Sequence, residues 1–230
     1  MDDIFPFRVI YEDNHLLTLD KPIGLATQGA PVGVESLFTL AQKYIKEKYN
    51  KPGAVYLGVV TRLDLPVSGV VVFARTSKAA NRLNEQFKTH AVRKVYHALL
   101  HGVLSEDQGE LINVICEDPN NHRLWVSAPN ARVPVKFKPK EARLKYRVLQ
   151  RFTANTLVEI ELKTGRKHQI RLQFSHLGNP IVGDAKYGAK YYEGLGICLH
   201  AAELTLVHPT TKETVVFKSP RPNWRRFITY

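Results

Sequence analysis

One carboxylate, Asp64, stands in the largely apolar stretch VVTRLDLPVSGVVVFAR, residues 59–75, two residues after Arg62. Ionisation of a carboxyl group away from water is unfavourable unless a cation or hydrogen bonds compensate. Asp64 is therefore either half of a structural ion pair or a reactive carboxylate, such as a nucleophile toward a sugar anomeric carbon. Spacing alone leaves these two interpretations about equal.

Two other sets of residues could take part in chemistry. Tyr96 alternates with Ala98 and Leu100 in RKVYHALLHG, residues 93–102. This spacing favours a core aromatic, although the ring could also pack on a base and the hydroxyl could carry a proton. The stretch GRKHQIR, residues 165–171, is too rich in cations for a core strand, and its arginines could bind phosphate or carboxylate.

No metal or nucleotide signature accompanies these residues. His97 and His101 are four residues apart on a predicted strand, without an HExxH motif or paired cysteines. The chain also has no GxxxxGK[ST], GxGxxG or GxSxG motif. We therefore expect no metal site and no cofactor.

The charge is strongly positive and unevenly distributed. The formal net charge is +12, and residues 121–171 hold 13 Lys/Arg against three Asp/Glu. Such a block attracts polyanions and favours a nucleic acid as partner, although a basic face kept for solubility is the alternative.

The remaining composition is that of a globular protein of the cytoplasm. No apolar run approaches the roughly 20 residues that cross a bilayer, and we see no secretory signal. Cys116 and Cys198 lie far apart, which is typical of reduced thiols. We expect a single domain over residues 1–230, with no membrane contact.

Periodicity predicts both helices and strands. Helical spacing covers 36–49 and 77–90, while 69–75, 94–102 and 156–162 have strand patterns and 203–220 a hairpin with a polar turn at 210–212. Residues 117–142 indicate irregular loops or short edge strands. The fold class is therefore α+β, a largely antiparallel mixed sheet with flanking helices and loops. Asp64 should lie on the loop that enters strand 69–75.

Taken together, these motifs resemble the RluA family of RNA pseudouridine synthases. TRLDLPVSGVVVFAR is similar to the family's RLDxxxSG loop and strand, and RKVYHALLHG to its K-x-Y-x-A-x-x-x-G strand. TGRKHQIRLQFSHLGNPIVGDAKYG resembles G-R-x-H-Q-I-R…G-x-P-I-x-G-D-x-x-Y-G. DKPIGLATQ and LHAAELTLVHP resemble the family's early and closing motifs, and all five occur in family order.

The resemblance implies a pseudouridine synthase fold and an isomerase that flips a uridine out of RNA and rejoins its base through C5. It implies three catalytic residues, Asp64, Tyr96 and Arg166. The residues that it implies for substrate binding are Arg62, Lys21, Lys94, Lys167, His168, Gln169 and Arg171. The partner would be structured ribosomal or transfer RNA, bound by a monomer without a cofactor.

The chain also departs from the family pattern. Thr61 stands where members usually have His, Val67 stands where they usually have Thr, and we expect no RNA-binding S4 domain before the first motif. Two rival functions remain, a non-catalytic RNA-binding protein and a hydrolase that releases the base. The target uridine does not follow from the residues.

Overall fold

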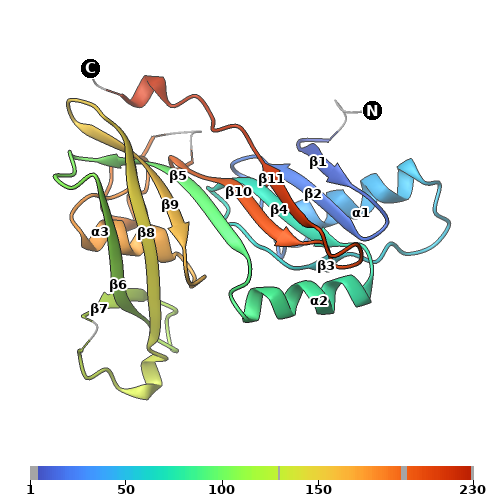
Figure 1. Cartoon of the computed structure of the whole chain (residues 1–230), viewed down its shortest axis with the longest axis horizontal. Helices are drawn as coiled ribbons and strands as arrows, with labels where there is room; N and C mark the ends of the chain where they lie inside the picture. Colours follow the sequence, from blue (N-terminus) through green and yellow to red (C-terminus); the bar gives the residue numbers. More distant parts are fainter. Residues whose placement is uncertain (1–4, 129, 193–195, 229–230) are drawn as a thin grey trace. The chain divides into compact units, whose positions relative to one another are not determined.

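The computed structural model describes residues 5–128, 130–192 and 196–228, and these form two compact units (Figure 1). Unit 1 consists of residues up to Arg93 together with His200–Arg221, and unit 2 of Lys94–Leu199 with the segment from Pro222 onward. The expectation of one domain over residues 1–230 stays a prediction.

Unit 1 is built on strands that pair mostly antiparallel, in the order β1, β2, β4, β10. β4 and β10 run parallel, β11 pairs with β10, and β3 pairs with β4. The strands are β1 (Arg8–Glu12), β2 (Leu16–Lys21), β3 (Gly58–Val59), β4 (Ser68–Ala74), β10 (Leu199–Val207) and β11 (Thr214–Lys218). The predicted strand 69–75 and the predicted hairpin 203–220 are thereby confirmed.

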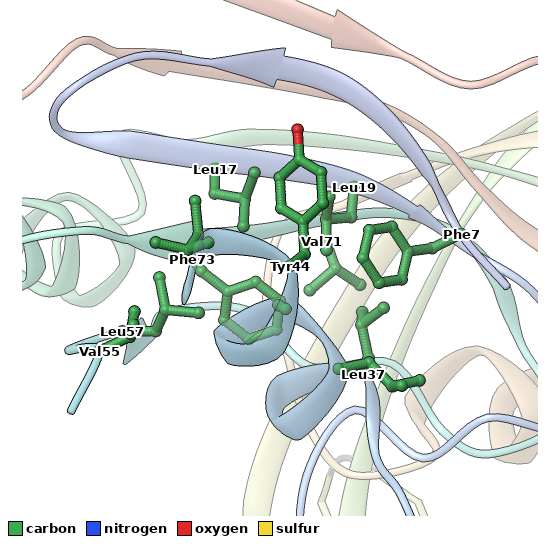
Figure 2. Packing of buried hydrophobic residues seen from close by; sticks show 12 residues of the cluster. Phe7, Leu17, Leu19, Leu37, Tyr44, Val55, Leu57, Val71 and Phe73 are labelled. Carbon is green, nitrogen blue, oxygen red and sulfur yellow. The ribbon is translucent and has the colours of Figure 1, made fainter. Parts of the chain in front are cut away.

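β4 is buried on both faces, which explains its continuous apolar run. Val71 and Phe73 join a cluster with helix α1 (Leu37–Lys48), shown in Figure 2. The alternate residues, Val70 and Val72 among them, join a second cluster with helix α2 (Ser77–Lys88). The period of two in a strand thus assigns one side of β4 to each helix.

Both helices of unit 1 begin at side-chain caps. The Ser36 hydroxyl accepts from the Thr39 N–H and the Thr39 hydroxyl accepts from the Ser36 N–H, while the Thr76 hydroxyl accepts from the Ala79 N–H. The helices predicted over 36–49 and 77–90 are confirmed.

Unit 2 contains an antiparallel array in the order β5, β9, β8, β6, β7. Its strands are β5 (Arg93–His101), β6 (Gln108–Glu117), β7 (Leu124–Ser127), β8 (Lys140–Arg151) and β9 (Asn155–Leu162). The short 3-10 helices are η1 (Val135–Phe137), η2 (Ala185–Tyr187) and η3 (Arg225–Phe227). Strands 94–102 and 156–162 and the irregular 117–142 segment agree with prediction, and so does the α+β class.

Helix α3 (Gln169–His176) of unit 2 is absent from the sequence-based expectations. It lies against one face of β6 and β8, where Leu172 packs with Ile115 and Ala142 (Figure 1). Its residues from Gln169 to Phe174 are all buried, so no polar face produces a helical pattern.

None of the described helices is long and apolar enough to cross a membrane.

Candidate active site

The expected site residues fall on both units. Unit 1 carries Asp64 together with Arg62 and Lys21. Unit 2 carries all the others: Lys94, Tyr96, Arg166, Lys167, His168, Gln169 and Arg171.

Asp64 lies on the loop between β3 and β4, as predicted, and this loop is bonded at alternate residues. The Thr61 hydroxyl accepts from the Val72 N–H at 2.9 Å. The Leu63 N–H donates to the Thr27 hydroxyl at 3.0 Å, and the Leu65 carbonyl accepts from the Gly24 N–H at 3.0 Å. These bonds involve residues 61, 63 and 65, which flank the exposed Arg62 and the half-buried Asp64.

A tight turn closes the loop and leads into β4. The Val67 N–H donates to the Asp64 carbonyl at 3.0 Å, with the turn at Leu65 and Pro66. Val67 itself is buried, 3% exposed, so the family departure at this position adds to the core.

The Ser-Gly pair after the turn is held against β10. The Ser68 hydroxyl and His200 Nδ1 lie 2.9 Å apart, and His200 Nε2 lies 3.2 Å from the Ser219 carbonyl. Gly69 has φ +115°, and a Cβ added there would lie 2.2 Å from the Ala201 carbonyl oxygen. Only glycine permits this approach.

Lys21 is fully buried beneath the Asp64 loop. Its amine donates to the carbonyls of Pro22, Leu25 and Leu65 at 2.9, 2.7 and 3.4 Å. Burial lowers the pKa of this amine to about 8, and the Asp64 carboxylate acts in the opposite direction. The sequence predicts an RNA contact for Lys21. In the structure its buried amine instead donates to backbone carbonyls of the protein.

The β5 part of unit 2 presents Lys94 and Tyr96 on one face of the strand, both half-buried. A Cβ added at Gly165 would lie 3.7 Å from the Lys94 amine, so this amine lies beside the segment that carries Arg166. Burial lowers the pKa of Lys94, and the positive charge of Arg166 lowers it further. This is a cationic environment suited to an anionic ligand.

Arg166 is placed by the Gln169 side chain. Gln169 Oε1 accepts from the Arg166 N–H at 3.0 Å and from the Thr164 hydroxyl at 2.7 Å, while its amide nitrogen donates to the Arg143 carbonyl at 3.1 Å. The guanidinium Nε donates to the Glu141 carbonyl at 2.8 Å. One of its five N–H donors is therefore bonded to the protein backbone.

The other residues that were expected to bind RNA differ in how far they are buried and in their bonds to the protein. Arg171 forms a bidentate, buried pair with Asp184 at 2.7 and 2.8 Å, and Gln169 is 3% exposed. His168 Nδ1 lies 2.6 Å from the Tyr187 hydroxyl, whereas Lys167 is exposed. The sequence predicts RNA contacts for Arg171 and Gln169. In the structure Arg171 instead bonds Asp184, the residue before η2, and Gln169 bonds the Arg166 segment.

The basic 121–171 segment divides into two parts. On β8, Arg143 pairs with Glu110 at 2.5 Å and Arg147 with Glu159 at 3.1 Å. Residues 121–140, in contrast, contain no Asp or Glu, and all five of their cations are exposed, namely Arg123, Arg132, Lys136, Lys138 and Lys140.

Thr27 is the residue of this site that sequence reasoning missed. Its hydroxyl bonds the residue before Asp64, and although Thr27 lies within DKPIGLATQ, that motif gives no sign that its side chain bonds a loop 36 residues away. In the part of the chain that is described, no group of three or more His, Cys, Asp or Glu side chains is arranged to hold a metal ion.

Comparison with known proteins shows the family of the chain. The family model described as RNA pseudouridylate synthase matches residues 15–176. A dual-specificity RNA pseudouridine synthase RluA of Haemophilus influenzae is 35% identical over 92% of this chain and 91% of its own length.

Solved structures show the same fold. The human RNA pseudouridylate synthase domain containing 1 has a TM-score of 0.73 and 26% identity, covering 93% of this chain and 83% of that one. The human RNA pseudouridylate synthase domain containing 4 reaches a TM-score of 0.78 at 24% identity, covering 94% and 89%. The chain therefore belongs to the RNA pseudouridylate synthase family, whose members are isomerases that convert uridine in RNA to pseudouridine.

Proposed function

We propose that this chain converts particular uridines of ribosomal or transfer RNA to pseudouridine, with Asp64 as the catalytic carboxylate. The observation that carries the proposal is the Asp64 loop, which is bonded through the Thr61 side chain and the backbone of Leu63 and Leu65 around Arg62 and Asp64. A reacting group gains most when its position is fixed before the substrate arrives.

The reaction needs only atoms of the substrate. The bond between C1′ and N1 breaks, a bond between C1′ and C5 forms, and a proton leaves C5 while N1 gains one. Asp64 assists either by attacking C1′ or by accepting the 2′ proton. We assign Tyr96 to packing on the uracil and Arg166 to keeping Asp64 ionised, the roles that the family resemblance gives them.

The exposed cations of residues 121–140 support binding of the RNA backbone. This stretch holds five exposed Lys/Arg and no Asp or Glu, which favours attraction of phosphates, whereas Arg143 and Arg147 are already paired with glutamates. Arg62, exposed beside Asp64, is suited to fill the space of a flipped nucleotide or to hold its phosphate. We propose that the protein does this as a monomer in the cytoplasm.

The RNA class is supported by the names of relatives. A relative from Haemophilus influenzae is called dual-specificity, and one from Pseudomonas aeruginosa, 33% identical, is called ribosomal large subunit pseudouridine synthase D. Ribosomal RNA is therefore the first substrate to test, and transfer RNA, the other class that the family resemblance implies, is the second.

The experiment compares the unaltered protein with Asp64→Asn on unmodified ribosomal and transfer RNA transcripts. Pseudouridine is mapped by position, free uracil is measured, and RNA affinity is measured separately. We expect pseudouridine from the unaltered protein, a loss of about 10³-fold or more in rate for Asp64→Asn, and unchanged affinity. Asp107→Asn, on an exposed carboxylate paired with Arg151, is the matched control and should react normally.

Each contrary outcome has a definite meaning. Pseudouridine formed by Asp64→Asn at the normal rate contradicts the role of Asp64. Binding without any product would favour a non-catalytic RNA-binding protein, and release of free uracil would favour a hydrolase. Product on neither RNA class contradicts the proposed target.

A further inference from the structure

Thr27 bonds both backbone groups of Leu63, the residue that precedes Asp64. Its hydroxyl donates to the Leu63 carbonyl at 2.9 Å and accepts from the Leu63 N–H at 3.0 Å. The threonine is 3% exposed. One side chain thus replaces the pair of ladder bonds that a neighbouring strand would supply.

Thr27 is itself fixed by the start of helix α1. Its carbonyl accepts from the Phe38 N–H at 3.0 Å, and the carbonyl of Ala26 accepts from the Leu37 N–H at 2.8 Å. Because α1 is packed into the buried cluster of Figure 2, the position of the Thr27 hydroxyl is set by a rigid element.

Thr61 bonds the other flank of the loop to β4. Its hydroxyl accepts from the Val72 N–H at 2.9 Å and lies 3.5 Å from the Val72 carbonyl. Val72 is fully buried in the centre of β4. Thr61, one of the two residues that depart from the family pattern, therefore has a defined contact in this chain.

We propose that Thr27 and Thr61 are positioning residues for the reaction at Asp64. Together they fix the backbone at 61 and 63, on both sides of Arg62, and the Leu63 side chain packs against the α1 cluster. The direction of the next side chain, the Asp64 carboxylate, follows from that backbone. This inference rests on the proposed role of Asp64.

Positioning differs from support of the fold in what a substitution changes. A neutral hydrogen bond contributes only a small part of the stability of a folded protein. A displacement of about 1 Å in a reacting group, in contrast, lowers a rate by about 100-fold. Loss of one of these hydroxyls should therefore affect the rate far more than the folded state.

The test replaces each hydroxyl by a methyl group of equal size, in Thr27→Val and Thr61→Val. The rate is the single-turnover release of tritium from transcripts made with [5-³H]uridine, on the RNA in which Asp64-dependent pseudouridine has been mapped. We expect a decrease of about 10- to 100-fold in rate, with RNA affinity unchanged. Thr27→Ser and Thr61→Ser keep the hydroxyl and should restore the rate to within about threefold of the unaltered protein.

Thr18 provides the matched control. It is fully buried on β2, opposite Val72 in the sheet register, and among the described atoms its hydroxyl has no hydrogen-bond partner. Thr18→Val makes the same chemical change in the same unit and should leave the rate unchanged.

A normal rate for folded Thr27→Val and Thr61→Val overturns the inference, and so does a loss that appears in RNA affinity instead of rate. If Thr27→Val does not fold, Thr61→Val and Thr61→Ser decide between the two results in the same way. The proposed function fails separately, when Asp64→Asn keeps its activity.

Discussion

The two segments that carry the candidate catalytic groups are held in place by different kinds of partner. The Asp64 loop is bonded by Thr27 and Lys21, which lie 36 and 44 residues from the loop residues that they bond. The Arg166 segment is bonded by Gln169, which lies only three residues away. The side chain that bonds the Arg166 backbone therefore comes from the same motif, with carbonyls of β8 as further acceptors, whereas the side chains that bond the Asp64 loop from outside come from a remote segment.

The two segments differ in whether the side chain that bonds the loop backbone belongs to the same sequence motif. Around Arg166 the motif residue Gln169 accepts from the Arg166 N–H, and the Glu141 carbonyl of β8 accepts from the guanidinium. Around Asp64 the loop residues provide mainly backbone groups, and the side chains that bond them come from the segment before α1. Substitutions outside the Asp64 motif should therefore affect that half of the site.

The largest expected effect is that of Gly69→Ala. At φ +115° a side chain is strained, and the new Cβ would lie 2.2 Å from the Ala201 carbonyl oxygen. The atoms that the new Cβ would meet are backbone atoms of Ala201, and their displacement would disturb β10. We therefore expect a loss of about 4 kcal/mol or more in the free energy of unfolding. Urea unfolding followed by circular dichroism measures it. A stable Gly69→Ala protein would contradict the close contact of β4 with β10.

Parts of the fold that are determined by local sequence patterns can be predicted, whereas parts that depend on packing with distant residues cannot. Helices α1 and α2 have one apolar face and capping hydroxyls, and β4 has an apolar run, so local patterns reveal them. Helix α3 is buried around its first six residues and begins without a side-chain cap, so its pattern shows no helical face. Its helical form depends on packing against β6 and β8.

The next expected effect concerns Lys21 and depends on pH. The amine has a pKa of about 8 in the folded protein, against 10.5 for the ordinary group. Between these two values the unfolded chain binds more protons, so stability rises with pH, by about 3 kcal/mol in total. Below pH 8 that amount is a cost of burying the charged amine. Lys21→Met lacks the rise.

Urea unfolding of both proteins between pH 7 and 10.5 tests this. The stability difference between the unaltered protein and Lys21→Met should shift by about 3 kcal/mol in favour of the unaltered protein as pH rises. Lys43→Met, on the exposed side of α1, is the control and should give a difference independent of pH. A constant difference for Lys21→Met would show that its amine is not buried as described.

A smaller effect is expected for Gln169→Leu, beside Arg166. The change leaves the Arg143 carbonyl and the Arg166 N–H without their bonds to this side chain, which should cost about 2–3 kcal/mol. Because Arg166 also loses its placement, the rate per folded molecule should decrease. Thermal unfolding and the tritium assay measure the two effects.

Gln86→Leu is the matched control for Gln169. The Gln86 side chain bonds both the N–H and the carbonyl of Val207 in unit 1. Its loss should lower stability with no change in rate per folded molecule. If both leucine variants reduce the rate equally, the decrease reflects general instability, and the placement of Arg166 by Gln169 is wrong.

The site itself was only partly predictable. The resemblance in the motifs predicts catalytic roles for Asp64, Tyr96 and Arg166, and these roles stay predictions. The motifs also predict Lys21, Gln169 and Arg171 as RNA-binding residues, because residue type does not distinguish a buried donor from an exposed one. Only the fold shows that Lys21 and Gln169 donate to backbone carbonyls and that Arg171 donates to Asp184.

The smallest effect is expected for Gly165→Ala, the glycine that stands beside Arg166. A Cβ there would lie 3.7 Å from the Lys94 amine, an ordinary contact with the end of a flexible side chain. Stability should change by less than about 0.5 kcal/mol, against about 4 kcal/mol for Gly69→Ala. Parallel urea titrations of the two variants give the contrast directly. Equal losses would mean that the Arg166 half is as tightly enclosed by backbone as the Asp64 half, and the comparison between them would fail.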